Sequence, residues 1–338
     1  MRMKESEYVS ALIVVKNEQD FIEKALMSLI NQEYPKNLYE IIVVDGGSSD
    51  NTISIVEKIR DDVIIPSGIA FQFLSNPKGI LASGWNIALK AAKGEYVFRI
   101  DAHSIVGKNY IYQCLNLLRK VDAVCVGGTM QSLTIDPKQK YVSSVLSSPF
   151  GVGNSKFRYS QKAQYVDTVA FGMYRKSVFD KVGYFDENLK RNQDIELHSK
   201  IRKSGGKFFL DPSIEVIYYT RNSKMKMMRQ GFENGKWNLI LAKKNPEALS
   251  IRHVIPMFFT IFLFVWFLLE RLDCRLKKIG RGGMAIYTFF AVLFSYKQEK
   301  NIKAMLNMPI LFLLLHISYG IGSIVGVFCK MEKKDGNV

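Results

Sequence analysis

The run YVSALIVV at residues 8–15 predicts a buried β-strand near the start of the chain. It is rich in β-branched residues, and FIEKALMSLI follows at residues 21–30 with its apolar residues at helical spacing. Helix-like and strand-like segments continue to alternate along the chain: YEIIVVD (39–45), TISIVEKI (52–59), FQFLS (71–75), ILASGWNIALKAAK (80–93) and EYVFRID (95–101). This alternation predicts an α/β fold with a mostly parallel, Rossmann-like sheet whose ligands bind at the carboxyl ends of the strands.

Length and charge indicate a folded chain with an anionic partner. The 338 residues suffice for one large or two modest domains, and a hydrophobic content of 48% excludes a disordered or collagen-like polymer. The net charge is +16, and the part from residue 224 onward holds 18 Lys and Arg against 7 Asp and Glu. Because this basic part also contains the longest apolar runs, we expect it to meet acidic membrane lipids and not nucleic acid.

Three apolar runs lie in this C-terminal part, at residues 254–269, 284–296 and 305–329. A helix needs about 20 residues to cross a hydrocarbon core of roughly 30 Å. The third run is therefore long enough to cross, the first is marginal, and the second suits a re-entrant or interfacial helix. The alternative for all three is a buried helix of a soluble core.

The start of the chain and the cysteines bear on the compartment. The polar stretch MRMKESEYVS (1–10) predicts that no signal peptide precedes the fold and that the N-terminal domain is cytosolic. The four cysteines show no CxxC spacing, so the sequence indicates neither a zinc site nor a disulfide framework. Both observations fit a reducing compartment.

Polar residues stand where three of the expected strands end. Asn17 and Glu18 follow the first strand, Asp45 ends the second, and Asp101 ends the strand at 95–101. Carboxyl ends of parallel strands meet at one edge of a sheet, so we expect these side chains to line one site. A dinucleotide-binding turn needs GxGxxG directly after the first strand, and Lys-Asn-Glu stands there instead, which excludes oxidoreductases of that type.

Asp101 and His103 bracket one residue at a strand end, so both side chains can share a divalent cation. A carboxylate with an imidazole suits Mn²⁺ at least as well as Mg²⁺, which prefers oxygen ligands and water. The alternative is a helix cap for Asp101 and a surface position for His103.

A second acidic pair, Asp194 and Glu196, falls at the start of an expected helix whose last turn is basic. Two interpretations stay open. The pair complements the helix dipole, or it supplies a general base.

Six motifs, taken together and in order, resemble the inverting glycosyltransferases of family 2, which have the GT-A fold. They are VVKNE (14–18), VVDGGSSDNT (43–52), NPKGILASGWNIAL (76–89), GEYVFRIDAHS (94–104), GMYRKSVFDKVGYFDE (172–187) and NQDIEL (192–197). The tail sequence HISYGIGSIVG (316–326) and the triplet DAH in place of the usual DxD bring the chain close to the succinoglycan-type exopolysaccharide glycosyltransferases.

The resemblance implies roles for the residues at the strand ends. Asp45 contacts the nucleotide base, Asp101 and His103 hold the nucleotide diphosphate through Mn²⁺ or Mg²⁺, and Asp194 deprotonates the acceptor hydroxyl. The remaining matches line the donor pocket: Asn17, Glu18, Lys78 and Asn86.

One departure from the family's pattern concerns processivity. Processive synthases of this superfamily carry QxxRW, whereas this chain has ENGKW at residues 233–237. Lys236 and Trp237 keep a cation and an indole, and they are candidate contacts to phosphate or acceptor. The missing glutamine and arginine favour transfer of a single sugar over polymer extrusion.

These features predict a GT-A domain over residues 1–223, a basic amphipathic interfacial segment over 224–252, a membrane anchor of two or three helical segments over 253–330, and a polar tail over 331–338. The expected activity is transfer of one sugar from a nucleotide-sugar, UDP-linked, to a polyprenyl-diphosphate-linked saccharide in bacterial exopolysaccharide or capsule biosynthesis. The expected place is the inner membrane, with the catalytic domain in the cytosol. The alternatives are a polyprenyl-phosphate sugar synthase and a non-catalytic nucleotide-binding membrane scaffold.

Overall fold

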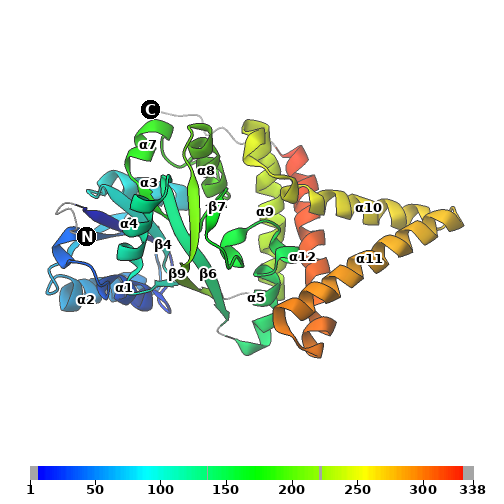
Figure 1. Cartoon of the computed structure of the whole chain (residues 1–338), viewed down its shortest axis with the longest axis horizontal. Helices are drawn as coiled ribbons and strands as arrows, with labels where there is room; N and C mark the ends of the chain where they lie inside the picture. The colour runs from blue at the N-terminus through cyan, green and yellow to red at the C-terminus, as the bar shows by residue number, and fades with distance from the viewer. Residues whose placement is uncertain (1–6, 135, 221–222, 330–338) are drawn as a thin grey trace. The chain divides into compact units, whose positions relative to one another are not determined.

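The computed structural model describes residues 7–134, 136–220 and 223–329 (Figure 1). The chain divides into two compact units. Unit 1 consists of Met1–Ser132 and Lys156–Tyr219, and unit 2 consists of Leu133–Ser155 and Thr220–Val338.

A sheet runs through unit 1 in the order β3-β2-β1-β4-β8-β6-β9-β5, with β7 paired to β9. The strands are β1 (Val9–Val15), β2 (Tyr39–Asp45), β3 (Ala70–Ser75), β4 (Tyr96–Asp101), β5 (Ser104–Val106), β6 (Cys125–Thr134), β7 (Gln164–Val166), β8 (Met173–Arg175) and β9 (Phe208–Thr220). The first four strands pair in parallel, as the sequence predicts. Beyond them, β8 pairs antiparallel with β4 and β6, and β9 pairs antiparallel with β5 and β7.

Helices cover both faces of this sheet (Figure 1). The longer helices of unit 1 are α1 (Ile22–Ile30), α2 (Thr52–Ile59), α3 (Leu81–Ala91), α4 (Tyr110–Lys120), α7 (Ser177–Val182) and α8 (Gln193–Lys203), with short turns η1 (Lys36–Leu38), η2 (Arg60–Ile64) and η4 (Lys156–Arg158). Side chains alternate along β1, so Ala11 and Ile13 join the core under α1, α2 and α4, whereas Leu12 joins the core under α3, α7 and α8. This arrangement confirms the predicted α/β fold.

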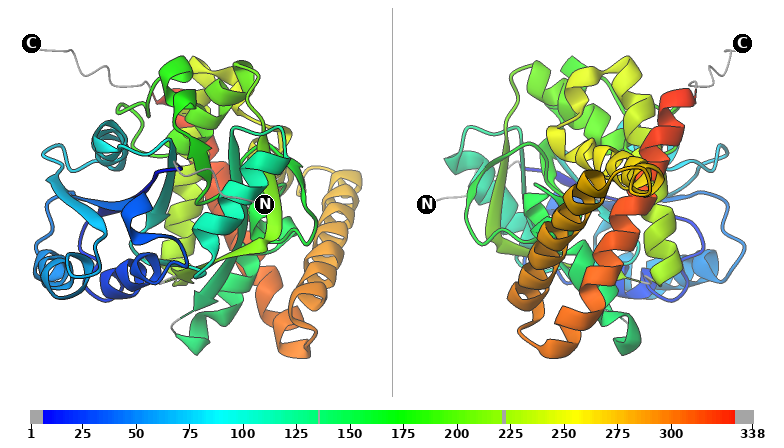
Figure 2. Two further views of the ribbon diagram at one scale, coloured as in Figure 1. Left: turned by 60° about the vertical axis from the view of Figure 1, so that its left-hand side comes forward. Right: turned by 90° about the vertical axis from the view of Figure 1, so that its right-hand side faces the viewer.

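Unit 2 is helical (Figure 2). Its elements are α5 (Lys140–Leu146), α6 (Pro149–Val152), α9 (Lys224–Lys244), α10 (Ile255–Leu269), α11 (Cys274–Glu299) and α12 (Ile302–Phe328), with short turns η3 (Pro137–Gln139), η5 (Pro246–Ala248) and η6 (Ile251–His253). Figures 1 and 2 show α9 beside α12, and α10 meeting α11 at their shared turn.

Residues 133–155 belong with the C-terminal helices, although the sequence places them inside the domain over 1–223. Val145 of α5 shares a buried apolar cluster with Phe312 of α12. The Glu299 carboxylate at the end of α11 pairs with Lys140 at 2.6 Å and accepts a hydrogen bond from Ser144. These contacts join segments more than 150 positions apart, so local sequence patterns do not reveal them.

Helices α9 and α12 approach each other closely through glycines. A Cβ atom on Gly235 of α9 would lie 2.1 Å from the Tyr319 carbonyl oxygen, and one on Gly322 of α12 would lie 2.0 Å from the Phe232 carbonyl oxygen. No larger residue fits without separating the helices. The basic segment that the sequence assigns to the membrane surface therefore packs one face of α9 on α12 of the same unit.

Two helical stretches of the described part are long and apolar enough to cross a membrane: Ile251–Leu269, which joins η6 to α10, and Ile302–Phe328, which is α12. Their most apolar 18 residues have mean hydropathies of 1.9 and 2.1. Helix α10 leaves large aromatic side chains such as Phe258, Phe264 and Phe267 more than 60% exposed. The apolar run at 284–296 is not a separate segment, because it forms the second half of α11, whose first half is basic. The two apolar C-terminal helices indicate membrane association.

Candidate active site

Three turns meet at the carboxyl edge of the parallel strands, as the sequence predicts. Strand β1 lies between β2 and β4, and the register pairs Val15 with Asp45 and Val14 with Asp101. Asn17 and Glu18 follow directly after β1. The residues expected at the strand ends therefore share one edge of unit 1, where a doubly wound sheet binds its ligand.

Asp45 organises the turn after β2. Its carboxylate accepts hydrogen bonds from the Gly47 amide at 2.9 Å, from the Ser48 amide at 3.1 Å and from the Ser48 hydroxyl at 2.6 Å. Gly47 has a φ of +82°, a conformation that glycine adopts without strain. These contacts within the chain hold the turn in shape. A contact between Asp45 and a nucleotide base stays a prediction.

Asn17 and Glu18 tie the end of β1 to this turn. The Asn17 side chain accepts a hydrogen bond from the Ser49 amide at 2.8 Å, and the Asn17 amide donates to the Ser48 hydroxyl at 3.0 Å. Asn17 has a φ of +55°, which is uncommon for a residue other than glycine and typical of functional turns. The Glu18 amide donates to the Thr52 hydroxyl at 2.8 Å, and its carboxylate faces His103.

The structure brings Asp101, His103, Glu18 and Asp194 into one electrostatic neighbourhood. Burial raises the pKa of the Asp101 carboxyl above its usual value, the nearby charges of Asp194 and Glu18 add to this rise, and His103 and Arg99 oppose it. The His103 Nδ1 atom lies 3.2 Å from the Glu18 Oε1 atom. Carboxylates whose charges act on one another in this way favour a bound cation.

The residues at this point fit a divalent cation. The described residues include no group of three or more His, Cys, Asp or Glu side chains placed to hold a metal. A pair of protein ligands suits a cation whose shell is completed by substrate phosphates and water. Glu18 Oε2 is buried without a hydrogen-bond partner in the described chain. The tautomer with its proton on His103 Nδ1, directed at Glu18, would have the ring's lone pair on Nε2, as in carboxylate–histidine–metal arrangements.

Asp194 lies in the first turn of α8, as expected, and its side chain is 43% exposed. Its Oδ2 atom is 3.7 Å from a guanidinium nitrogen of Arg99 on β4. One turn later, buried His198 shares hydrogen bonds of 2.6 Å with the Thr168 hydroxyl and with the Tyr174 hydroxyl. These bonds fasten the start of α8 to the neighbouring segments and thereby fix the backbone under Asp194.

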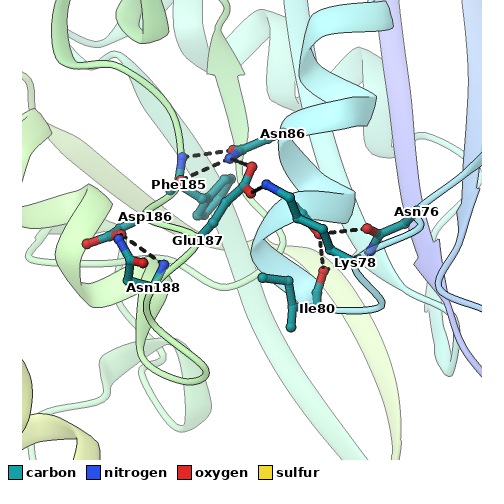
Figure 3. Close-up of polar contacts among 9 residues, drawn as sticks. Asn76, Lys78, Ile80, Asn86, Phe185, Asp186, Glu187 and Asn188 are labelled. Atoms are coloured by element: carbon teal, nitrogen blue, oxygen red, sulfur yellow. Dashed lines mark hydrogen bonds and ion pairs between the residues drawn. The ribbon is translucent and has the colours of Figure 1, made fainter. Parts of the chain in front are cut away.

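Lys78 and Asn86 lie near each other, and Glu187 connects them by contacting both side chains (Figure 3). The Glu187 carboxylate pairs with the Lys78 ammonium at 2.6 Å and accepts a hydrogen bond from the Asn86 amide at 2.9 Å. Asn86 also donates to the Phe185 carbonyl and accepts from the Phe185 amide, both at 2.9 Å. Both amide hydrogens of Asn86 are therefore used in holding the segment before α8. Direct contacts of Lys78 and Asn86 with a donor stay predictions.

Lys236 and Trp237 lie on α9 in unit 2. The Trp237 indole donates a hydrogen bond to the Glu233 carboxylate at 3.2 Å, one turn earlier on the same helix. Their contact with phosphate or acceptor stays a prediction.

Three further residues lie near the carboxylates but are not among the site residues predicted from the sequence: Arg99, Arg158 and Tyr218. Burial and the charge of Asp101 raise the pKa of the Tyr218 phenol, and Arg158 opposes this rise. The Tyr218 ring meets the His103 ring edge-on at 4.8 Å between centroids. A signal existed for Arg99, because it is a cation inside an apolar strand, on the same face as Asp101. For Arg158 and Tyr218 no local pattern marks the position.

Comparison with known proteins identifies the family. The model of the glycosyl transferase family 2 domain matches residues 10–183. A dolichyl N-acetyl-alpha-D-glucosaminyl phosphate 3-beta-D-2,3-diacetamido-2,3-dideoxy-beta-D-glucuronosyltransferase of Methanococcus voltae is 25% identical over 325 residues, 93% of this chain and 95% of the relative. The succinoglycan biosynthesis protein ExoA of Rhizobium meliloti is 27% identical over 252 residues, 73% of this chain and 74% of the relative.

A solved structure supports the fold. The mannosyltransferase PcManGT from Pyrobaculum calidifontis, in complex with GDP-Man and Mn²⁺, superposes with a TM-score of 0.65 at 16% identity, over 93% of this chain and 87% of that one. This likeness confirms the GT-A-like architecture that the sequence predicts. Since the family's domain covers more than half of the sequence, the chain belongs to glycosyl transferase family 2 and is a glycosyltransferase.

Proposed function

We propose that this glycosyltransferase moves one sugar from a nucleotide-sugar, UDP-linked, to a saccharide carried on a polyprenyl phosphate or diphosphate, with inversion at the anomeric carbon. The observation that supports the proposal is the strand register, which puts Asp45 and Asp101 at the same edge of the parallel strands. Two contacts add to it: Asp194 of α8 lies 3.7 Å from Arg99 of β4, and His103 lies 3.2 Å from Glu18. Such an acceptor suits an enzyme at the bacterial inner membrane whose donor site faces the cytosol.

The geometry supports a single displacement. Inversion requires a base on the face of the sugar opposite the leaving diphosphate and needs no enzyme nucleophile. Asp194 takes the base role, because its exposed carboxylate can accept the proton of an acceptor hydroxyl. Asp101 and His103 would hold a divalent cation, Mn²⁺ or Mg²⁺, which when bound neutralises charge that develops on the leaving group. Asp45, Asn17 and Glu18 shape the pocket for the nucleotide.

The acceptor is inferred from the two apolar helices and from the relatives. By its name, the Methanococcus voltae relative acts on a sugar linked to dolichyl phosphate, and the Rhizobium meliloti relative serves succinoglycan biosynthesis. By their names, both relatives take part in building a saccharide, and the first acts on a lipid-linked sugar. A lipid-linked acceptor also explains why the basic excess lies beside the apolar helices.

A donor panel tests the proposal. Membranes that contain the protein are incubated with Mn²⁺, labelled UDP- and GDP-sugars, and three acceptors: polyprenyl phosphate, a polyprenyl-phosphate monosaccharide and a polyprenyl-diphosphate saccharide. Membranes with Asp194→Asn serve as the matched control. We expect one donor to label the extractable lipid, and the mass of the product distinguishes an extended saccharide from a newly made polyprenyl-phosphate sugar. Nucleotide binding without transfer from any donor would contradict the proposal.

A further inference from the structure

We propose that Arg99 is a positioning residue for Asp194: its guanidinium, held between the rings of Trp85 and Phe185, keeps the Asp194 carboxylate in the orientation that transfer requires. The inference rests on the proposed role of Asp194 as the base. It concerns a residue that contacts the proposed base.

Strand geometry puts Arg99 in this place. Along β4 the side chains of Val97, Arg99 and Asp101 share one face, and Val97 joins the core under α3 and α8. Arg99 therefore points from the sheet toward the start of α8, where Asp194 lies. Burying an arginine in the middle of an apolar strand costs free energy of desolvation, and a nearby negative charge offsets this cost.

Two aromatic rings fix the guanidinium. Its central carbon lies 5.5 Å from the centroid of the Trp85 ring and 5.4 Å from the centroid of the Phe185 ring, and the Arg99 side chain is only 15% exposed. A planar guanidinium stacks on aromatic faces, whereas an ammonium group is a compact, strongly hydrated charge. The slot therefore suits arginine and leaves its cation few alternative positions.

The second ring is itself held in place. Asn86 of α3 bonds both the amide and the carbonyl of Phe185, and Glu187 bridges Asn86 to Lys78 (Figure 3). Lys78 and Asn86, which the sequence assigns to the donor pocket, thus fix the position of Phe185. The Phe185 ring in turn contacts Arg99. This chain of contacts ends at Asp194, because Arg99 lies 3.7 Å from its carboxylate.

The backbone at Asp194 is fixed by other contacts, whereas its carboxylate has few contacts that fix its orientation. The backbone of α8 is fastened by His198 through Thr168 and Tyr174. The Asp194 side chain is 43% exposed, and among the described residues its carboxylate has one contact besides Arg99, a hydrogen bond that it accepts from the amide of the next residue, Ile195, at 3.0 Å. A fixed cation restricts the rotation of such an exposed side chain without covering the oxygen that takes the proton.

Chemical rescue of Arg99→Ala tests the inference in the full-length protein. We expect kcat to fall about 10²-fold, since a misplaced catalytic group costs roughly this much, while the KM for the donor and the Mn²⁺ requirement change little. Guanidinium ions at about 50 mM are expected to restore at least a tenth of the lost turnover by entering the slot between the rings, whereas ammonium ions at the same concentration restore none.

Control variants separate the possible outcomes. Arg60→Ala removes a surface arginine that pairs with Asp61 at 2.7 Å, and its turnover should not respond to guanidinium. Arg99→Lys keeps the charge but not the planar group, and we expect it to stay below a tenth of wild-type turnover. Full turnover in Arg99→Lys, or no rescue of Arg99→Ala by guanidinium, would overturn the inference. A raised Mn²⁺ requirement with unchanged kcat would do so too, because it would assign Arg99 to Asp101.

The proposed function fails separately. Asp194→Asn should have the same reduced turnover with and without guanidinium. If Asp194→Asn turns over normally, the base assignment is wrong whatever Arg99→Ala does. If Asp194→Asn has this reduced turnover and Arg99→Ala is not rescued, the base assignment stands and only the role of Arg99 is lost.

Discussion

Asp194→Asn is expected to reduce transfer about 10²- to 10⁴-fold, which is the range that a matched general base contributes. The asparagine has nearly the same shape but cannot accept the proton of the acceptor hydroxyl. Nucleotide binding should remain, because Asp45, Asn17 and Glu18 form their turns without help from Asp194. Initial rates of label transfer and the affinity for UDP, measured on the same membranes, give both quantities.

Asp180→Asn is the matched control for this variant, since Asp180 is exposed on the short helix α7 and the same exchange there should leave transfer unchanged. Unchanged turnover in Asp194→Asn would remove Asp194 from the base role. Loss of nucleotide affinity instead of turnover would assign the residue to the shape of the pocket.

His103→Ala is expected to raise the Mn²⁺ concentration for half-maximal transfer by about 10²-fold, because the imidazole is, with Asp101, one of the two proposed protein ligands of the cation. Glu18→Gln should raise it less, by roughly 10-fold, since Glu18 acts on the cation through the orientation of His103. Titrations of transfer and of donor binding with Mn²⁺, run on wild type and both variants, measure these shifts.

An unaltered Mn²⁺ response in His103→Ala would show that other groups hold the cation. A larger effect of Glu18→Gln than of His103→Ala would also contradict the assigned order, and would make Glu18, whose buried Oε2 has no partner in the described chain, the ligand itself.

The parallel half of the fold could be predicted from the sequence because its signals are local. Strands β1, β2 and β4 are largely apolar runs; β2 and β4 end in an aspartate, and polar residues follow β1 directly. Helices with a regular apolar spacing separate them. Residues such as Asp45 and Asp101 then fall at one edge by the rules of parallel sheets, without any knowledge of tertiary contacts.

The parts that sequence reading misses depend on long-range packing. Asn86 bonds the backbone of Phe185 across 99 positions, and no periodicity in either segment announces this contact. The expectation that Asn86 lines the donor pocket arises from the motif around it, whereas its partners in the structure hold the segment before α8. Similarly, α5 joins the C-terminal unit through Glu299, although its position between β6 and β7 suggests the first domain.

Arg99 is an intermediate case. Its position in FRIDAHS is visible in the sequence, and the alternation of β4 places it on the face of Asp101. The contact of Arg99 with two aromatic rings cannot be predicted from the sequence. Trp85 and Phe185 come from segments 100 positions apart that meet only in the folded unit. A charged residue within an apolar strand next to a strand-end aspartate is the signal that would have found it.

The anomeric configuration of the product shows whether transfer is a single displacement. After transfer from a donor of known α configuration to a lipid-linked acceptor, the released saccharide is examined by proton NMR, where the coupling of the anomeric proton reports the new linkage. A single displacement driven by one base predicts a β-linked product. An α-linked product would require a second displacement on the enzyme, and would contradict the assignment of Asp194 as a base in a one-step reaction.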